Sequence, residues 1–401
     1  MISDINNIFS EAALRMKPSA IRECLKLTQQ PDIISFAGGL PAPESFPVDD
    51  LNKITEEVFR EDATAALQYT TTEGDQLLRE QLLERYRNEG CDITINNIAV
   101  STASQQALDL LGKIFINPGD KVICGLPSYL GGLSAFNAYG AELTGIPFDE
   151  NGMQSTLLED KLKELKSQND LPKFIYLIPD FQNPAGITMP KQRRIEILEI
   201  AKKYDVLIIE DSPYREVRFE GEHQPMFYSL DNTGHVITLG TFSKTLAPGF
   251  RLGWVIGHED ILAQYIQAKQ AADLCTSTLI QKIAAKYLQK GLMDKNLEMT
   301  IQNYHEKRDL MIEGFQKHMP EGVRWTTPQG GLFLFLYLPE HMDATDLFFK
   351  AVKQKVAFVQ GEVFHCDGSG KNTMRINFSY VGREKNIEGV KRLADVIKEN
   401  M

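Results

Sequence analysis

Short apolar runs alternate with helix-like stretches along much of this chain, and this alternation restricts the possible folds more than any other feature. The runs expected as strands are 98–100, 121–124, the first half of 174–186, 206–209 and 235–239. Strands that alternate with helices form a mostly parallel sheet that is covered on both faces. Ligands of such sheets bind beyond the carboxyl ends of the strands. The pattern therefore predicts an α/β protein with its ligand site along one edge of the sheet.

Length and composition exclude several classes of protein. The 401 residues allow a sizeable core and two or three domains. A net charge of -11 argues against broad affinity for nucleic acid. The five cysteines are dispersed without a C-x-x-C pair, which favours free thiols in a reducing compartment and argues against a metal site. The N-terminus lacks the features of a signal peptide, and no apolar run approaches membrane-spanning length. We therefore expect a cytoplasmic protein without a metal or a membrane partner.

The segment T-L-G-T-F-S-K-T-L-A-P-G-F-R-L-G-W carries the clearest chemical signal. Lys244 follows a predicted strand end, beside the hydroxyls of Thr241 and Ser243 and seven residues before Arg251. Burial lowers the pKa of a lysine, and the neutral amine is a nucleophile. Hydroxyls and a guanidinium bind phosphate. Pyridoxal phosphate (PLP) needs both an amine for its aldehyde and an anion site for its phosphate.

Two other interpretations of Lys244 compete with this one. One is a solvated loop lysine beside a structural arginine. The other is a phosphate-binding P-loop, because Lys244-Thr245 matches the end of G-x-x-x-x-G-K-[ST]. Ser243 and Thr238 stand where that motif requires glycine, so the P-loop fails on the residues that let backbone amides approach phosphate.

Further polar and aromatic side chains follow the other predicted strands. Asn183 and Asp211 each come just after a strand, so one crevice could collect them with Lys244. Tyr129 lies just beyond another strand end, where its ring could stack on a cofactor or belong to the core. Ser104 lies at the start of a helix with Ser101 and Thr102; these hydroxyls could cap the helix or, with its amides, bind a phosphate.

Beyond residue 254 the pattern changes. A long helical region over 259–316 precedes short strands mixed with helices, which indicates a smaller α+β domain packed with the N-terminal arm. Arg375 lies in the otherwise apolar strand M-R-I-N-F-S. A buried arginine is costly without an anion, so Arg375 is predicted to bind a substrate carboxylate. In the arm, Arg22 stands in the first turn of a short predicted helix, where a cation opposes the helix dipole.

Taken in order, these motifs resemble the fold-type I, PLP-dependent aminotransferases of class I/II, in particular the 2-aminoadipate and kynurenine/aminoadipate aminotransferases. The resemblance covers nearly the whole chain. It rests on S-A-I-R-E-C-L-K-L-T, S-F-A-G-G-L-P-A-P-E, Y-T-T-T-E-G-D-Q-L-L-R-E, A-S-Q-Q-A-L-D-L, F-Q-N-P-A-G, E-D-S-P-Y, T-F-S-K-T-L-A-P-G-F-R-L-G-W and M-R-I-N-F-S. It implies a large domain with a mostly parallel seven-stranded sheet and a smaller α+β domain. The expected division is an arm over 1–48 that is part of the small domain, a PLP-binding domain over 49–290 and a C-terminal small domain over 291–401.

The resemblance also implies roles around the cofactor. Lys244 would form the Schiff base and then shuttle a proton, and Asp211 would pair with the pyridinium nitrogen. Asn183 and Tyr214 would hydrogen-bond the phenolic oxygen, while Tyr129 would stack on the ring. The residues implied around the phosphate are Ser104, Gln105, Thr241 (where serine is frequent), Ser243, Arg251 and Tyr69 of the partner subunit.

For the substrate, the resemblance implies that Arg375 and Asn183 hold the α-carboxylate end, that Arg22 meets a distal carboxylate and that Gly39 lines the side-chain pocket. The implied activity is ping-pong transfer of an amino group from an L-amino acid to a 2-oxo acid. The expected donors are 2-aminoadipate, aromatic or large apolar amino acids, and the expected acceptor is 2-oxoglutarate. A tyrosine reaching across subunits implies a homodimer with shared active sites.

Two alternatives remain at this stage. A β-lyase, a decarboxylase or a cyclopropane-forming synthase could use the same scaffold and the same lysine. The effector domain of a transcription regulator could keep the fold without catalysis. Such regulators carry a basic winged-helix domain before the arm, whereas here the arm begins at residue 1 and the net charge is negative.

Overall fold

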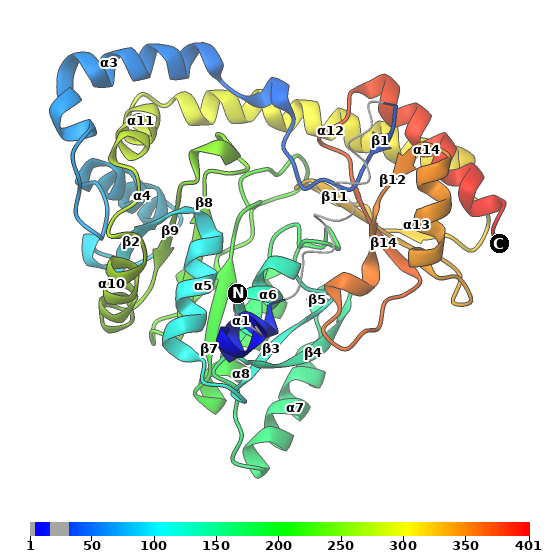
Figure 1. Ribbon diagram of the computed structural model, residues 1–401, viewed down its shortest axis with the longest axis horizontal. Helices are drawn as coiled ribbons and strands as arrows, with labels where there is room; N and C mark the ends of the chain where they lie inside the picture. Colours follow the sequence, from blue (N-terminus) through cyan, green and yellow to red (C-terminus); the bar gives the residue numbers. More distant parts are fainter. Residues whose placement is uncertain (1–4, 17–31) are drawn as a thin grey trace.

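A sheet of eight strands forms the centre of the computed structural model, which describes residues 5–16 and 32–401 (Figure 1). Its order is β2 (Ile98–Ser101), β9 (Gly253–Ile256), β8 (Val236–Thr241), β7 (Leu207–Asp211), β6 (Phe174–Leu177), β3 (Lys121–Leu126), β4 (Glu142–Asp149) and β5 (Gly152–Met153). The run from β8 to β4 is parallel, while β9 and β5 pair antiparallel with their neighbours. The predicted mostly parallel sheet is confirmed, with β5 a two-residue addition to seven longer strands.

Helices cover both faces of this sheet, as the alternation of strands and helices predicted. Ile209 and Leu239 pack on one face with Leu108 of α5, whereas Ile208 packs on the other face with Ile197 of α8. Neighbouring residues of a strand point to opposite faces, so a strand that is apolar throughout is buried on both sides. The helices of this part are α3 (Val48–Ala66), α4 (Gln76–Asn88), α5 (Ala103–Phe115), α6 (Leu130–Ala138), α7 (Ser155–Ser167), α8 (Lys191–Tyr204), α9 (Phe227–Leu230), α10 (Glu259–Asp273) and α11 (Thr278–Gln289).

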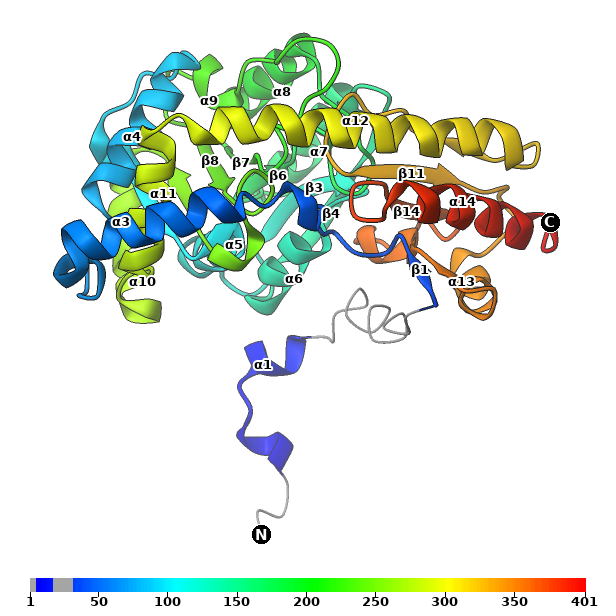
Figure 2. The same ribbon diagram turned by 90° about the horizontal axis from the view of Figure 1, so that it is seen from above.

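A second, antiparallel sheet lies at the far end of the long helix α12 (Leu292–His318), which extends along both sheets in Figure 2. Its order is β10 (Arg324–Trp325), β11 (Phe333–Tyr337), β14 (Thr373–Asn377) and β13 (Val359–Gln360). Helices α13 (Ala344–Lys353) and α14 (Arg383–Lys398) accompany it. The N-terminal segment joins this part of the molecule, because β1 (Ile34–Ser35) pairs with β12 (Val356–Ala357). The remaining short elements are η1 (Ile5–Ile8), α1 (Glu11–Arg15), η2 (Pro43–Ser45), η3 (Ile95–Asn97), η4 (Pro248–Phe250) and η5 (Gly361–Phe364).

The structure adds detail to two local predictions. The helical region over 259–316 consists of three helices, broken where Leu274 and Gly291 adopt positive φ values of 63° and 64°. The start of α5 has no side-chain cap. The Thr102 hydroxyl donates instead to the Asp273 carboxylate on α10 at 2.9 Å, and that of Ser101 donates to the carbonyl of Ala103. Thr102 and Ser101 therefore do not cap the helix, which was one of the two roles expected of these hydroxyls.

Across the residues that the structure describes, no helix is long and apolar enough to cross a membrane.

Candidate active site

A cavity of about 330 Å³ opens beyond the carboxyl ends of β3, β6, β7 and β8, where the parallel sheet predicted a ligand site. All the predicted site residues except Tyr69 and Arg22 line it. They are Gly39, Ser104, Gln105, Tyr129, Asn183, Asp211, Tyr214, Thr241, Ser243, Lys244, Arg251 and Arg375. The fold thus brings together side chains that are spread over more than three hundred residues of sequence.

Lys244 lies in the turn that follows β8, with its amine directed into the cavity. Its Nζ donates a hydrogen bond to the carbonyl of Gly39 at 2.8 Å. Within the described chain no carboxylate pairs with it. Burial, together with the positive charges of Arg375 and Arg251, lowers the pKa of Lys244 to about 8. A sizeable part of the amine is therefore neutral near physiological pH and available as a nucleophile or a base.

Asp211 is the last residue of β7 and is 2% exposed. Its Oδ2 accepts a hydrogen bond from the Tyr176 hydroxyl at 2.8 Å, while Oδ1 has no partner among the residues described. Burial raises the pKa of Asp211 to about 7. A buried carboxylate with one free oxygen fits a cationic N–H donor, such as the pyridinium of PLP.

Tyr176 was not predicted as a site residue, because its place inside an apolar strand is typical of the core. Its ring reaches Asp211 past Gly132 of α6, where a Cβ atom would lie 2.8 Å from the tyrosine ring. In the sequence, only the small residue Gly132 on the facing helix is consistent with the contact between Tyr176 and Asp211. Phe333 and Phe364, whose rings lie 4.3 and 5.1 Å from the Arg375 guanidinium, carried no recognisable signal.

Arg375 is 1% exposed, and no carboxylate in the described ranges pairs with it. It donates to Asn183 Oδ1 at 2.9 Å and to the carbonyl of Ala37 at 2.7 Å, while its Nε has no partner there. Asn183 in turn donates to the Tyr214 hydroxyl at 3.3 Å. Burial lowers the pKa of Arg375 to about 10, so the guanidinium stays charged at neutral pH. A buried cation without a counter-ion is suited to hold the carboxylate of a ligand.

The opposite end of the cavity is suited to a phosphate. Ser104 and Gln105 lie in the first turn of α5, whose amides carry no side-chain cap. Ser243 Oγ lies 3.0 Å from Thr241 Oγ1, and the guanidinium of Arg251 completes the group. Tyr129 Oη donates to Gln105 Oε1 at 3.3 Å, which places its ring in the cavity wall. An amine, an anion site and a carboxylate with a free oxygen in one cavity fit PLP.

Two predicted residues are not in this group. Tyr69 lies between α3 and α4, is 77% exposed and does not line the cavity. Arg22 lies outside the described residues.

Comparison with known proteins agrees with this chemistry. The chain matches the family model "aminotransferase class I and II" over residues 32–393. It is 49% identical over 400 residues to aromatic-amino-acid aminotransferase 1 of Thermococcus litoralis, covering 99% of this chain and 96% of the relative. Among solved structures, it is similar to kynurenine aminotransferase from Pyrococcus horikoshii in complex with PMP, with a TM-score of 0.96, 46% identity and coverage of 100% and 99%. It also resembles LysN, an α-aminoadipate aminotransferase from Thermus thermophilus complexed with N-(5'-phosphopyridoxyl)-L-leucine, with a TM-score of 0.92, 37% identity and coverage of 99% and 98%.

Proposed function

Because this chain belongs to the class I and II aminotransferases and is a PLP-dependent transaminase, we propose that the cavity around Lys244 is its active site. The observation that carries this proposal is that one cavity is lined by an amine, a carboxylate and a guanidinium, none of which has a counter-ion in the described chain. Asp211 Oδ1 and the Nε of Arg375 are buried without a hydrogen-bond partner there, and Lys244 Nζ donates only to the carbonyl of Gly39. Buried polar groups are normally satisfied, so this arrangement marks a ligand site.

Each group has a distinct task in the proposed site. PLP supplies an aldehyde for the amino group and a ring that accepts the electrons released when the Cα–H bond breaks. Lys244 Nζ would take up the proton lost from Cα and release it again. Asp211 Oδ1 would accept a hydrogen bond from the ring N–H and favour its protonated form. Arg375 holds the α-carboxylate, so that one Cα bond is oriented for cleavage.

Around these groups, the proposed cofactor site keeps the roles predicted from the sequence. Asn183 and Tyr214 would hydrogen-bond the phenolic oxygen, and Tyr129 would stack on the ring. The proposed phosphate group is Ser104, Gln105, Thr241, Ser243 and Arg251. The α5 amides without a side-chain cap and the 3.0 Å contact between the two hydroxyls support this assignment.

The activity can be tested from the absorbance of the purified, PLP-loaded protein before and after single amino acids are added. We expect an amino acid to bleach the cofactor band and release one equivalent of its 2-oxo acid. Addition of 2-oxoglutarate should then restore the band. Bleaching with ammonia or carbon dioxide as the stoichiometric product would instead indicate lyase or decarboxylase chemistry.

For the substrates we propose 2-aminoadipate, aromatic and large apolar amino acids as donors and 2-oxoglutarate as the acceptor. The relatives support this breadth, since their names include aromatic amino acids, kynurenine and α-aminoadipate, and one structure contains an adduct of leucine. Gly39 lines the cavity, and we propose that it forms part of the wall of the side-chain pocket.

Arg22→Ala is predicted to lower kcat/KM selectively for dicarboxylic donors. A charge-assisted hydrogen bond contributes about 1.5–3 kcal/mol, which corresponds to a loss of roughly 10- to 100-fold. The measurement is kcat/KM of wild type and variant with 2-aminoadipate and with leucine. Leucine has no distal carboxylate and serves as the control; an equal loss with both donors would contradict the role of Arg22.

Tyr176→Phe is predicted to raise the pKa of Asp211, because the carboxylate loses the donor at Oδ2. We expect kcat/KM to fall by about tenfold and the pH dependence of the cofactor spectrum to shift upward. Tyr287→Phe is a matched control, since Tyr287 is also fully buried but its hydroxyl has no partner in the described chain and it lies outside the cavity. If both variants give the same spectrum at every pH, Tyr176 does not position Asp211.

The lowered pKa of Lys244 predicts a specific pH dependence for cofactor uptake. Only the neutral amine reacts, so the rate at which the apoenzyme takes up PLP should rise about tenfold per pH unit below about 8. Above that pH the rate should level off. A free alkylamine measured in parallel should continue to accelerate towards pH 10, as an amine in water does. An enzyme rate that also rises to pH 10 would show that the amine is not perturbed.

We also propose a cytoplasmic homodimer with shared active sites. Tyr69 and the neighbouring Leu67 are exposed by 77% and 70%, as expected of a segment that enters a partner copy. The free cysteines of the described chain suit a reducing compartment. The proposed domain division at residues 48 and 290 places β2 to β9 in the large domain and β10, β11, β13 and β14 in the small one.

A further inference from the structure

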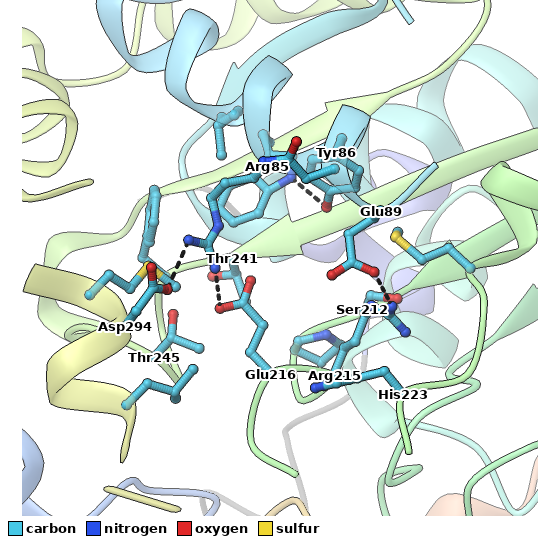
Figure 3. Close-up of a pocket in the computed structure, with 18 of the residues that line it drawn as sticks. Arg85, Tyr86, Glu89, Ser212, Arg215, Glu216, His223, Thr241, Thr245 and Asp294 are labelled. Atoms are coloured by element: carbon cyan, nitrogen blue, oxygen red, sulfur yellow. Dashed lines mark hydrogen bonds and ion pairs between the residues drawn. The ribbon is translucent and has the colours of Figure 1, made fainter. Parts of the chain in front are cut away.

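A second cavity, of about 360 Å³, lies behind the wall of the proposed active site. It shares Pro213 and Thr241 with the first cavity. Figure 3 shows its side chains, which come from α4, from the start of α12 and from the segments after β7 and β8. In Figure 2, α4, α9 and the start of α12 lie on the side of the molecule opposite to α1. Apart from Thr241, no residue that was given a role above lines this cavity.

The inner walls are apolar and aromatic. Phe242 and Trp254 lie with their ring centroids 4.8 Å apart, and Met226, Met293 and Leu297 add flexible apolar surface. The indole N–H of Trp254 is already used, because it donates to the Tyr86 hydroxyl at 2.8 Å. The ring surface and the methionine sulfurs remain to make contacts, and both favour aromatic partners.

Ser212 and Thr245 line this cavity, and neither hydroxyl has a partner among the residues that the structure describes. Ser212 Oγ and Thr245 Oγ1 are both buried and make no hydrogen bond to any described residue. Thr245 is only 6% exposed. Because buried polar atoms are nearly always hydrogen-bonded, these hydroxyls indicate where a polar atom of an occupant binds.

The charged groups at the cavity pair with one another. Arg85 lies 3.0 Å from Glu216 and 3.1 Å from Asp294, and Arg215 pairs with Glu89. These contacts are drawn in Figure 3. A charged occupant would therefore find no unpaired counter-ion among these described residues, and its charge would lose hydration without compensation. Burial and nearby arginines lower the pKa of His223, so it too is neutral at physiological pH. The cavity therefore selects an uncharged molecule.

The volume sets the size of the occupant. At about 360 Å³ the cavity is more than twice the roughly 150 Å³ of an engineered apolar cavity that binds benzene. One ring with substituents, or two fused rings, would fill it.

We propose that this cavity is a binding site for an uncharged aromatic molecule of one or two rings that carries a single hydrogen-bonding group, as indole and phenol do. The occupant stacks against Trp254 and Phe242 and bonds to the hydroxyl of Ser212 or Thr245. The site goes beyond the proposed transamination and does not depend on which amino acids are its donors.

The test is calorimetric titration of the PLP-loaded protein with indole, and with indole-3-carboxylate as the charged comparison. We expect indole to bind with a dissociation constant of about 1 mM or lower, and the carboxylate at least tenfold more weakly. Ile301→Trp should fill the cavity and weaken indole binding at least about tenfold. Ile312→Trp is the matched control, because Ile312 is also a half-buried isoleucine of α12 but does not line the cavity.

Each outcome decides the proposal. Absence of indole binding to the wild type overturns it. Equal binding by wild type and Ile301→Trp also overturns it, because the indole would then occupy another site, such as the amino-acid pocket. If Ile301→Trp fails to retain PLP, Leu297→Phe takes its place, and the same comparison applies. Loss of binding in the cavity-filling variant alone, with the cofactor spectrum unchanged, supports the site whether or not the proposed donors are correct.

Discussion

Lys244→Ala is expected to abolish transamination while the protein stays folded. The amine is both the proposed attachment point for PLP and the group that moves the proton, and removal of a positioned acid–base group alone costs 10²- to 10⁴-fold. We expect a loss of at least about 10³-fold in the release of 2-oxo acid. After borohydride treatment, the wild type should retain the cofactor on the peptide that contains Lys244, and the variant should not. Normal oxo-acid formation by the variant would refute the assignment.

Stability distinguishes this role from a structural one. The pKa of Lys244 is lowered in the folded protein to about 8, so folding becomes less favourable as pH falls from about 10.5 to 8 and stays so below. At pH 7 the wild-type apoenzyme carries this cost and the alanine variant does not. We therefore expect the variant apoenzyme to have an equal or higher thermal midpoint at pH 7. Lys244→Arg is the control for charge, since it keeps the cation but offers no nucleophilic amine.

The proposed active site could largely be predicted from the sequence because its residues follow strands. Carboxyl ends of parallel strands meet at one edge, so Asn183, Asp211 and Lys244 had to lie close together once the strands were recognised. The residues that hold these groups in place could not be found in this way. Tyr176 lies in the middle of an apolar strand, and its contact with Asp211 depends on the space beside Gly132. The local sequence pattern does not predict that Tyr176, Asp211 and Gly132 lie close together.

The other missed features also depend on distant contacts. Thr102 should cap α5 by its position alone, but Asp273, which is 171 residues away, binds its hydroxyl. The helix ends at Leu274 because this residue adopts a positive φ. Leucine rarely adopts such a φ, so its helix propensity does not predict the break. The second cavity combines two hydroxyls and three ion pairs that only the tertiary structure brings together. Sequence patterns predict where strands end and which faces of helices and strands are buried. The Thr102 contact and the second cavity depend instead on which distant residues pack against each other.

Asp211→Asn is predicted to have the second largest effect. The amide has the same size, but it carries no charge to stabilise a protonated ring nitrogen. Loss of one preorganised electrostatic partner lowers kcat by about 10²- to 10³-fold. The measurements are kcat with 2-aminoadipate and 2-oxoglutarate, and the pH dependence of the cofactor spectrum. An unchanged spectrum and unchanged kcat would contradict the pairing of Asp211 with the ring.

The same variant tests whether Asp211 serves function at the expense of stability. Burial raises the pKa of this carboxyl to about 7, so the wild-type apoenzyme should lose stability as pH rises from about 4 to 7. The introduced amide does not ionise, hence the variant apoenzyme should lack this loss and be at least as stable at pH 7. Binding of PLP should reverse the order, because only the carboxylate gains a cationic partner. A variant that is less stable than the wild type both with and without PLP would assign Asp211 to the fold instead. Lys244 would then serve catalysis and Asp211 the stability of the fold, although both groups face the same cavity without a counter-ion in the described chain.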